Sequence, residues 1–423
     1  MNLTQQESAA TISISHGRLI DPANHIDAIK DVHIQDGKII AVGSPPAGFN
    51  AQLNIDAKRQ IVCPGLVDLR CRIREPGHEN KGTIATETRA AVAGGVTSLC
   101  CPPDTDPVID NTAVIKLIRL KAQSEGLAKV YTLAALTQQL KGEKLSEMRE
   151  LKDAGCVGVS NALQPVTNTL VMRRALEYAA SHDITVFIHA DDHWLSNQGC
   201  AHEGGVSARL GLTGIPESSE TIAIARDLQL IELAGARAHF CQLSSAKSVE
   251  MIKQARAKGL QVSADATAHH LHLTEMDIGY FNTNCHVLPP LRSQRDQTAL
   301  RQGIVDNTIC CIVSDHQPHN NDAKLAPFAE SEAGISAVET LLPLALRMAD
   351  ETDMQLSEVI ARLTVQPAKI LNIPEGTLSI GGDADICIFD PEHYWRVDKE
   401  QLFSQGKNTP FQGWELKGRV THT

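Results

Sequence analysis

The segment DLRCRIREPG carries two arginines, Arg70 and Arg72, at a spacing that places both side chains on one face of a strand. The preceding run QIVCPGLV is almost continuously apolar, which is typical of a strand buried on both faces. A His-x-His pair at this spacing can bind one metal ion. A guanidinium is always charged and offers no lone pair to a metal, so we expect Arg70 and Arg72 to repel a divalent cation.

Other apolar, β-rich runs also end in residues that can do chemistry. Their carboxyl ends read CPPDTDP, VSNALQP, FIHADDH, CQLSS, ADATAHHL and VSDHQPH. These segments supply imidazole, carboxylate and amide groups. In a barrel of parallel strands such ends meet at one mouth, which is where barrel enzymes place their chemistry.

Strands and helices alternate from residue 63 to residue 372. Helical stretches such as NTLVMRRALEYAASH lie between short β-rich runs such as VYTLAAL and ITVFIHA. About eight strands with intervening helices over roughly 300 residues predict a (β/α)8 TIM-like barrel, an α/β fold. A doubly wound open sheet is the alternative, but the chain has no Gly-rich dinucleotide fingerprint or phosphate loop.

The two ends of the chain differ from this pattern. Residues 1–62 read as short strands, with a hairpin signal at Asp36-Gly37 in DVHIQDGKIIAVGS. Residues 373–423 return to short strands, in GTLSIGGDADICIFDP, WRVD and ELKGRVTHT. We expect the two ends to pair into one small β-domain beside a barrel formed by residues 63–372.

Composition excludes several classes of protein. The formal net charge of −11 disfavours nucleic acid and anionic membrane as partners, because both need a basic face. The eleven cysteines contain no C-x-x-C, and their adjacent pairs lie inside apolar runs. We therefore expect buried thiols in a reducing cytoplasm rather than disulfides or a zinc site. No signal peptide and no apolar run of membrane-spanning length is recognised.

Taken in order, the strand-end segments resemble the dihydroorotases of the amidohydrolase superfamily, of the type that begins PGxxDxHxHxREPG and ends SDHAPH. The matching segments are spread over nearly the whole chain, from PGLVDLRCRIREPG to SDHQPH. The resemblance implies the barrel fold of that superfamily. It also implies a zinc centre whose hydroxide attacks the ring amide of dihydroorotate in pyrimidine synthesis.

The resemblance locates the metal ligands, and most of them are replaced. The His-x-His pair of the family is Arg-x-Arg here, and VSNALQP has an amide and a methyl group where the family has two carboxylates. Only His189 and Asp315 keep a usable donor, whereas a zinc site needs at least three protein ligands. We therefore expect no zinc and no catalytic residue, with His189 and Asp315 as vestiges. The six degenerate ligand positions are Arg70, Arg72, Asn161, His189, Gln242 and Asp315.

The substrate pocket that the resemblance implies is altered as well. Arg74 and His319 are retained. Asp104 stands where the family has an amide that meets an anionic substrate, and Leu288 replaces a second amide. An acid facing a dicarboxylate is unfavourable in a partly desolvated site. The motif frames thus persist while their reactive side chains have changed.

Two interpretations are open for the arginines. Arg70 and Arg72 either bind an anion or pair with Asp315 and nearby acids, and we favour the pairing because a charge buried in a barrel mouth needs a partner. We likewise favour a hydrogen-bonded His189 over a residual metal ligand. For Asp315 we favour a salt bridge over general acid/base catalysis. The histidines of ATAHHLHL are not expected to bind metal.

Three functions are compatible with these residues. Some dihydroorotase homologues are inactive and assemble with aspartate carbamoyltransferase, so the resemblance implies a non-catalytic, structural subunit of such a complex. It further implies contact with the catalytic chains of the transferase, a homodimer within the hetero-oligomer and a cytoplasmic location. The alternative is an active zinc-dependent dihydroorotase or cyclic amidohydrolase with a reduced metal site on His189 and Asp315. A third is a metal-free sensor that holds an anionic pyrimidine precursor with Arg70, Arg72, Arg74 and His319.

Overall fold

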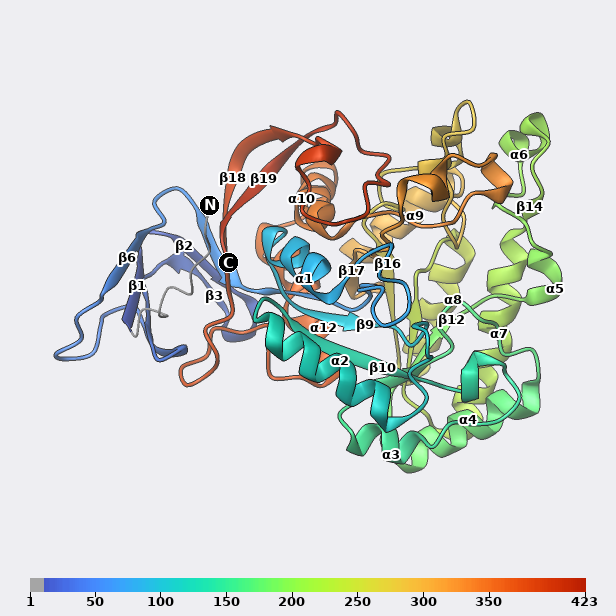
Figure 1. The fold of residues 1–423 in the computed structure, drawn as a ribbon, viewed down its shortest axis with the longest axis horizontal. Helices are drawn as coiled ribbons and strands as arrows, with labels where there is room; N and C mark the ends of the chain where they lie inside the picture. The colour runs from blue at the N-terminus through green and yellow to red at the C-terminus, as the bar shows by residue number, and fades with distance from the viewer. Residues whose placement is uncertain (1–10) are drawn as a thin grey trace.

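The computed structural model describes residues 11–423, and its centre is a sheet of eight parallel strands that closes into a barrel (Figure 1). The strands pair in sequence order, as expected for a (β/α)8 barrel, and the predicted fold is confirmed. The strands are β8 (Leu66–Asp68), β9 (Val96–Cys101), β10 (Lys129–Ala135), β11 (Gly158–Ser160), β12 (Val186–His189), β15 (Ala238–Cys241), β16 (Val262–Thr267) and β17 (Cys311–Val313).

The seam between the first and last barrel strands closes just beyond their carboxyl ends. The Arg72 N–H donates to the His316 carbonyl at 2.9 Å, and the His316 N–H donates to the Arg70 carbonyl at 3.2 Å. Cys71 and His316 form an isolated parallel bridge there. The two arginines and the residues after β17 therefore lie face to face across the seam.

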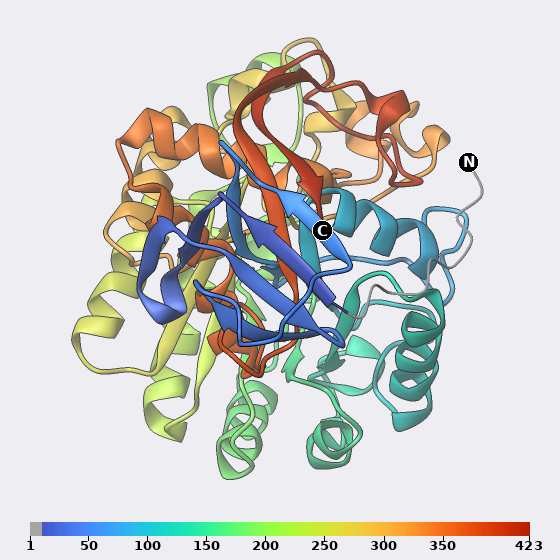
Figure 2. The same ribbon diagram turned by 90° about the vertical axis from the view of Figure 1, so that its left-hand side faces the viewer.

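Helices surround the barrel (Figure 2). A long connection between β12 and β15 also carries the short elements α5 (His193–Ser196), β13 (Ala201–His202), α6 (Gly205–Leu210) and β14 (Gly214–Ile215). The other helices are α1 (Ile84–Ala93), α2 (Thr112–Glu125), α3 (Met148–Asp153), α4 (Thr169–Ser181), α7 (Glu217–Ala234), α8 (Ala246–Ala257), α9 (Gln294–Val305), α10 (Leu341–Thr352), α11 (Leu356–Leu363) and α12 (Val365–Leu371). None of the helices within residues 11–423 is both long and apolar enough to cross a membrane.

Local signals position these helices, as α2 illustrates. The Asn111 side chain caps its start by accepting the N–H groups of Ala113 and Val114, at 3.1 and 3.2 Å. Gly126 ends it in the left-handed conformation, at a φ of 68°. The buried residues of α2 recur at helical spacing, so one face packs on the barrel.

The barrel interior has an apolar layer and a polar layer. The apolar layer contains Val67, Leu69, Cys100, Leu133, Phe187, Cys311 and Val313. Toward the carboxyl ends of the strands the buried side chains become charged or polar, with Arg70, Arg72, His189, Gln242 and Asp315 among them. All eleven cysteines are buried and free, which confirms that they form no disulfide.

Two further sheets are built from the chain ends. The first runs β5 (Lys38–Val42), β4 (Val32–Gln35), β1 (Thr11–Ser15) and β6 (Leu53–Asp56), and the Asp36-Gly37 turn joins β4 to β5 as predicted. The second runs β19 (Glu415–His422), β18 (Ile386–Arg396), β7 (Ile61–Pro64), β2 (Arg18–Asp21) and β3 (Ile26–Ile29). Because β7 pairs antiparallel with β18, the expected pairing of the two ends is confirmed.

The strand β18 corrects one expectation. The sequence separates ICIFDP from WRVD, but both belong to a single strand that continues through Pro391. The pairing of β18 with β19 shifts register between Asp390 and Tyr394. A bulge leaves the proline nitrogen outside the ladder of hydrogen bonds, which is why the strand tolerates it.

Candidate functional site

Arg70 and Arg72 extend from the end of β8 into the barrel mouth, where both are almost fully buried. Arg70 Nε and Arg72 Nη1 donate to the same oxygen of Asp315, Oδ1, at 3.1 and 3.0 Å. The Asp315 side chain is 2% exposed, and its other oxygen accepts a hydrogen bond from Gln317 Nε2 at 2.8 Å. The favoured ion pairs between the arginines and Asp315 are therefore present.

Asp104 is the second acid of this network. Its carboxylate accepts Arg72 Nε at 2.8 Å. Burial alone would raise the pKa of the Asp104 carboxyl, but the charge of Arg72 outweighs it and holds that pKa below its ordinary value. Sequence reasoning placed Asp104 against an anionic substrate, whereas in the structure it neutralises an arginine. Two guanidinium groups and two carboxylates thus balance one another in the mouth.

Asn161 follows β11 and does not point to the centre of the mouth. Its side-chain oxygen accepts the His189 N–H at 2.9 Å, and its Nδ2 donates to the carbonyls of His189 and Gln164, both at 3.0 Å. All three bonds go to backbone groups. The amide therefore joins β11 to β12, and its oxygen is already used. The adjacent Ala162 is buried and has no donor atom.

His189 ends β12 and contacts Gln242, the residue after β15. His189 Nδ1 lies 3.2 Å from Gln242 Oε1, which can only accept, so Nδ1 carries the proton. Burial, reinforced by the charge of Arg70, lowers the pKa of His189 to about 3, and the ring is neutral at pH 7. The arrangement is a hydrogen-bonded barrel histidine.

The residues at the six ligand positions do not fit a zinc ion. The Asp315 carboxylate is surrounded by N–H donors, the Asn161 amide is bonded to backbone, and Gln242 offers only a neutral amide. Two guanidinium groups lie where ligands are needed, and they repel a cation. These positions therefore lack the set of imidazole, thiolate or carboxylate donors that zinc requires.

Two other groups of possible metal ligands occur within residues 11–423, and neither contains any of the six positions. In the first, His239 donates or accepts through both ring nitrogens, to Ser263 at 2.8 Å and Asp265 at 2.9 Å. In the second, the Lys129 ammonium bonds to Glu375, Asp383 and Asp385 at 2.8–3.0 Å. The side chains of both groups thus already have protein partners, although the second oxygen of Glu375 is buried without one within residues 11–423.

Two of the three histidines after β16, His270 and His272, have protein partners, whereas neither ring nitrogen of His269 has one within residues 11–423. His270 Nδ1 bonds to the Thr267 hydroxyl at 2.6 Å, and His270 Nε2 lies 3.1 Å from the Pro289 carbonyl. His272 Nε2 lies 2.8 Å from the Leu344 carbonyl. The His270 ring therefore holds the Pro289 loop, and the His272 ring holds α10.

Four buried nitrogens in the mouth have no hydrogen-bond acceptor within residues 11–423. They are Nη1 and Nη2 of Arg70, Nη2 of Arg72 and Nε2 of Gln242. Buried donors without partners are unfavourable, by about 1–3 kcal/mol for a neutral group and more for a charged one. The centre of the mouth is rich in donors and poor in acceptors, which is the polarity that suits an anion.

The expected remnants of a substrate pocket lie in separate places. Arg74 Nε donates to the Pro318 carbonyl at 2.9 Å, and Arg74 Nη2 lies 3.2 Å from His319 Nε2. Asp104 lines a cavity of about 590 Å³, and Leu288 lines one of about 210 Å³ that His189 also lines. The two cavities share lining residues, so they adjoin at the mouth.

Sequence reasoning missed residues that hold the network in place. Gln317 fixes the second oxygen of Asp315, and it stands two residues later in the SDHQPH motif. Glu87, on α1, bonds to His316 Nε2 at 2.7 Å and to the Ser404 hydroxyl at 2.6 Å. The position of Gln317 within the SDHQPH motif could have pointed to it, whereas no sequence motif surrounds Glu87.

The amino-acid sequence matches one protein-family model and many known proteins. A protein-family model described as "Dihydro-orotase-like" matches residues 59–248. The "Dihydroorotase-like protein" of Pseudomonas aeruginosa is 48% identical over 413 residues, which covers 98% of this chain and 97% of that protein. The "Dihydroorotase" of Geobacter sp. (strain M21) is 43% identical over 410 residues, which covers 97% of this chain and 96% of that protein.

Solved structures support the fold. The L-hydantoinase of Arthrobacter aurescens superimposes with a TM-score of 0.87 at 24% identity, over 97% of this chain and 94% of that one. The D-hydantoinase of Thermus sp. gives a TM-score of 0.83 at 21% identity, over 97% and 94%. At these identities the likeness is one of fold alone.

The shared carboxylate generates a prediction about stability. Asp315→Asn keeps the shape of the side chain but leaves Arg70 and Arg72 buried without their common counter-charge. We expect the free energy of unfolding to fall by roughly 3–5 kcal/mol, measured by urea denaturation. Glu177→Gln is the control, because Glu177 pairs with Arg173 and Arg174 at the surface. Equal urea midpoints for the two variants would contradict the role given to Asp315.

Proposed function

This chain belongs to the dihydroorotase-like family, and we propose that it is a catalytically inactive member. In this proposal it serves as a structural, non-catalytic subunit of an aspartate carbamoyltransferase complex in pyrimidine biosynthesis. Its partners there are the catalytic chains of the transferase, and it enters the complex as a homodimer.

One observation supports the proposal that the chain is catalytically inactive. The Asp315 carboxylate, one of the two metal-ligand positions at which the family resemblance leaves a usable donor, accepts hydrogen bonds from both Arg70 and Arg72. Hydrolysis in the family depends on a metal-activated water. The residues present suit ion pairing instead, and the neutral His189 is bonded to Gln242 rather than free to act as a base.

The structural role is supported by what the chain keeps. The relatives match it from end to end, including the sheets formed by the chain ends, so the whole scaffold is retained. A fold that keeps its full architecture while its reactive side chains change is expected to act through its surface. The identity of the partner comes from the family resemblance, in which inactive homologues assemble with the transferase.

Co-purification tests this proposal. The chain is expressed with the catalytic chains of aspartate carbamoyltransferase from the same organism, captured through a tag on the transferase, and the complex mass is measured by light scattering. We expect a stable complex that has transferase activity and no dihydroorotase turnover. Elution of the two proteins as separate species would sink the structural role. Stoichiometric zinc together with turnover would favour the alternative, an active zinc-dependent dihydroorotase.

Restoring the histidine pair is expected not to restore catalysis. In Arg70→His/Arg72→His, Asn161 remains bonded to the backbone of β12 and Gln242 still offers an amide. We expect no dihydroorotase turnover when zinc is supplied, measured by the formation of carbamoyl aspartate from dihydroorotate. An unmodified dihydroorotase assayed in parallel is the control. Turnover from the double substitution alone would show that the other changed positions are dispensable.

The unpartnered donors favour a second candidate function, a metal-free sensor of an anionic pyrimidine precursor. Arg70, Arg72 and Gln242 together present four buried nitrogen donors without acceptors, and Arg74 is close enough to Arg72 and Asp104 to feel their charges. A ligand carboxylate would satisfy several of these donors at once through charge-assisted hydrogen bonds.

Calorimetric titration with carbamoyl aspartate and with dihydroorotate tests the sensor. If the donors hold a ligand carboxylate, heat is released on binding and disappears in Gln242→Leu/Arg72→Met, which removes two of the unpartnered groups. Circular dichroism confirms that this variant is folded. No heat at millimolar ligand would end the hypothesis.

A further inference from the structure

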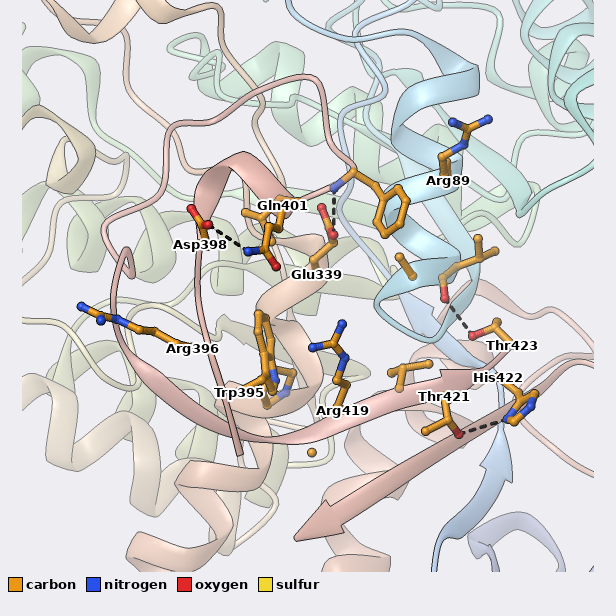
Figure 3. Close-up of a pocket in the computed structure, with 17 residues that line it drawn as sticks. Arg89, Glu339, Trp395, Arg396, Asp398, Gln401, Arg419, Thr421, His422 and Thr423 are labelled. Atoms are coloured by element: carbon orange, nitrogen blue, oxygen red, sulfur yellow. Dashed lines mark hydrogen bonds between the residues drawn. The ribbon is translucent and has the colours of Figure 1, made fainter. Parts of the chain in front are cut away.

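A cavity of about 410 Å³ lies away from the mouth, between α1, the start of α10 and the hairpin of β18 and β19 (Figure 3). Val92 of α1, Pro343 of α10 and Trp395 of β18 contribute apolar surface to it. The C-terminal hairpin packs on α10 through β19, and α1 lines the other side of the cavity. None of the positions considered for catalysis lines it.

Three arginines from separate elements meet at this cavity. They are Arg89 of α1, Arg396 of β18 and Arg419 of β19, and all three are exposed. Figure 3 shows Arg419 at the centre, with Arg89 and Arg396 on opposite sides. Among the ion pairs of residues 11–423, none involves any of these arginines. On a chain with a net charge of −11 they form a local basic surface.

The acids of the cavity do not neutralise this surface. Glu339 accepts the backbone N–H groups of Phe403 and Ser404, both at 3.0 Å. Asp398 accepts Gln401 Nε2 at 3.0 Å. Both carboxylates thus serve to hold the loop after β18 rather than to pair with the arginines.

The cavity also offers apolar contact and a free donor. The Trp395 indole N–H is buried and has no acceptor within residues 11–423. Phe403 also lines the cavity, and its aromatic side chain is 55% exposed. An occupant must therefore bring carboxylate groups, one hydrogen-bond acceptor and an apolar side chain.

The shape of the lining favours an extended chain. Residues 418–423 line the cavity without interruption, and β19 is the edge strand of its sheet within the described residues. An extended peptide can follow such a run, with alternate side chains directed to the cavity. Nucleic acid fits less well, because the net charge of −11 repels a long polyanion.

We propose that this cavity is the docking site for an acidic, extended peptide segment of a partner chain. Its carboxylates pair with Arg89, Arg396 and Arg419, and one apolar side chain packs on Trp395. The segment belongs to the transferase if the proposed function holds, and only that choice of source rests on the proposed function. The site itself rests on charge complementarity and on the apolar surface.

Peptide binding to the full chain tests the site directly. The probe is a fluorescein-labelled peptide, Asp-Glu-Phe-Asp-Glu, and its neutral counterpart is Asn-Gln-Phe-Asn-Gln. Binding is measured by fluorescence anisotropy. We expect Arg89→Ala/Arg396→Ala/Arg419→Ala to bind the acidic peptide roughly tenfold or more weakly than the wild type, because several charge-assisted contacts are lost. The neutral peptide is expected to bind the wild type as weakly as the acidic peptide binds the triple variant.

A matched variant controls for net charge. Arg149→Ala/Arg173→Ala/Arg174→Ala removes two exposed arginines and one half-buried arginine from α3 and α4, and it is expected to bind like the wild type. Equal weakening by both triple variants would overturn the proposal, as would equal binding of the acidic and neutral peptides. Failure of the acidic peptide to bind at millimolar concentration, or its displacement by an equal concentration of inorganic phosphate, would overturn it too.

Co-purification of the same variants with the transferase separates the two proposals. Loss of the complex for the triple variant at Arg89, Arg396 and Arg419, but not for the control variant, supports both. A complex that survives both substitutions leaves the subunit role standing and shows that this cavity is not its interface. If the wild type itself forms no complex, the proposed function fails, and the peptide measurement alone decides the docking site.

Discussion

The structure of the barrel mouth depends on one carboxylate that two arginines share. Asp315 lies after the last strand, and Arg70 and Arg72 lie after the first, so their ion pairs cross the seam of the barrel. With Asp104, the network holds two positive and two negative charges in a region that excludes most water. Buried charges persist only when they are compensated in this way. Gln317 helps to hold this network, because it donates a hydrogen bond to the second oxygen of Asp315.

The backbone of the mouth retains the form of a reactive site. Ala162, Gln242 and Asp315 follow three different barrel strands, and each has a positive φ, of 50°, 57° and 45°. Non-glycine residues seldom adopt this conformation, and it clusters where side chains are aimed at a ligand. The alanine side chain is a methyl group, so this conformation does not aim a reactive group at a ligand. The conformation at Ala162 is therefore set by the fold around it and not by its side chain.

Much of this architecture could be predicted from the sequence. The barrel follows from apolar strands alternating with helices, and the joining of the chain ends follows from their short strands. The pairing of Asp104 with Arg72 could not be predicted, because it depends on which way two side chains from neighbouring strands turn. The orientation of Asn161 was equally hidden, since its partners are backbone groups of the next strand. The cavity beside Trp395 needed the long hairpin, which Pro391 disguised in the sequence as two strands.

The closed seam has a consequence for how the molecule matures. When an ion joins the first and last strands of a barrel, assembly is complete only after that ion has been captured. Here the fastening is encoded in the chain itself, by side chains that lie 245 residues apart in Arg70 and Asp315. Nothing needs to be loaded after synthesis for this fastening to form. The seam can then close as soon as the end of the last strand folds against the first, because both halves of its fastening come from one chain.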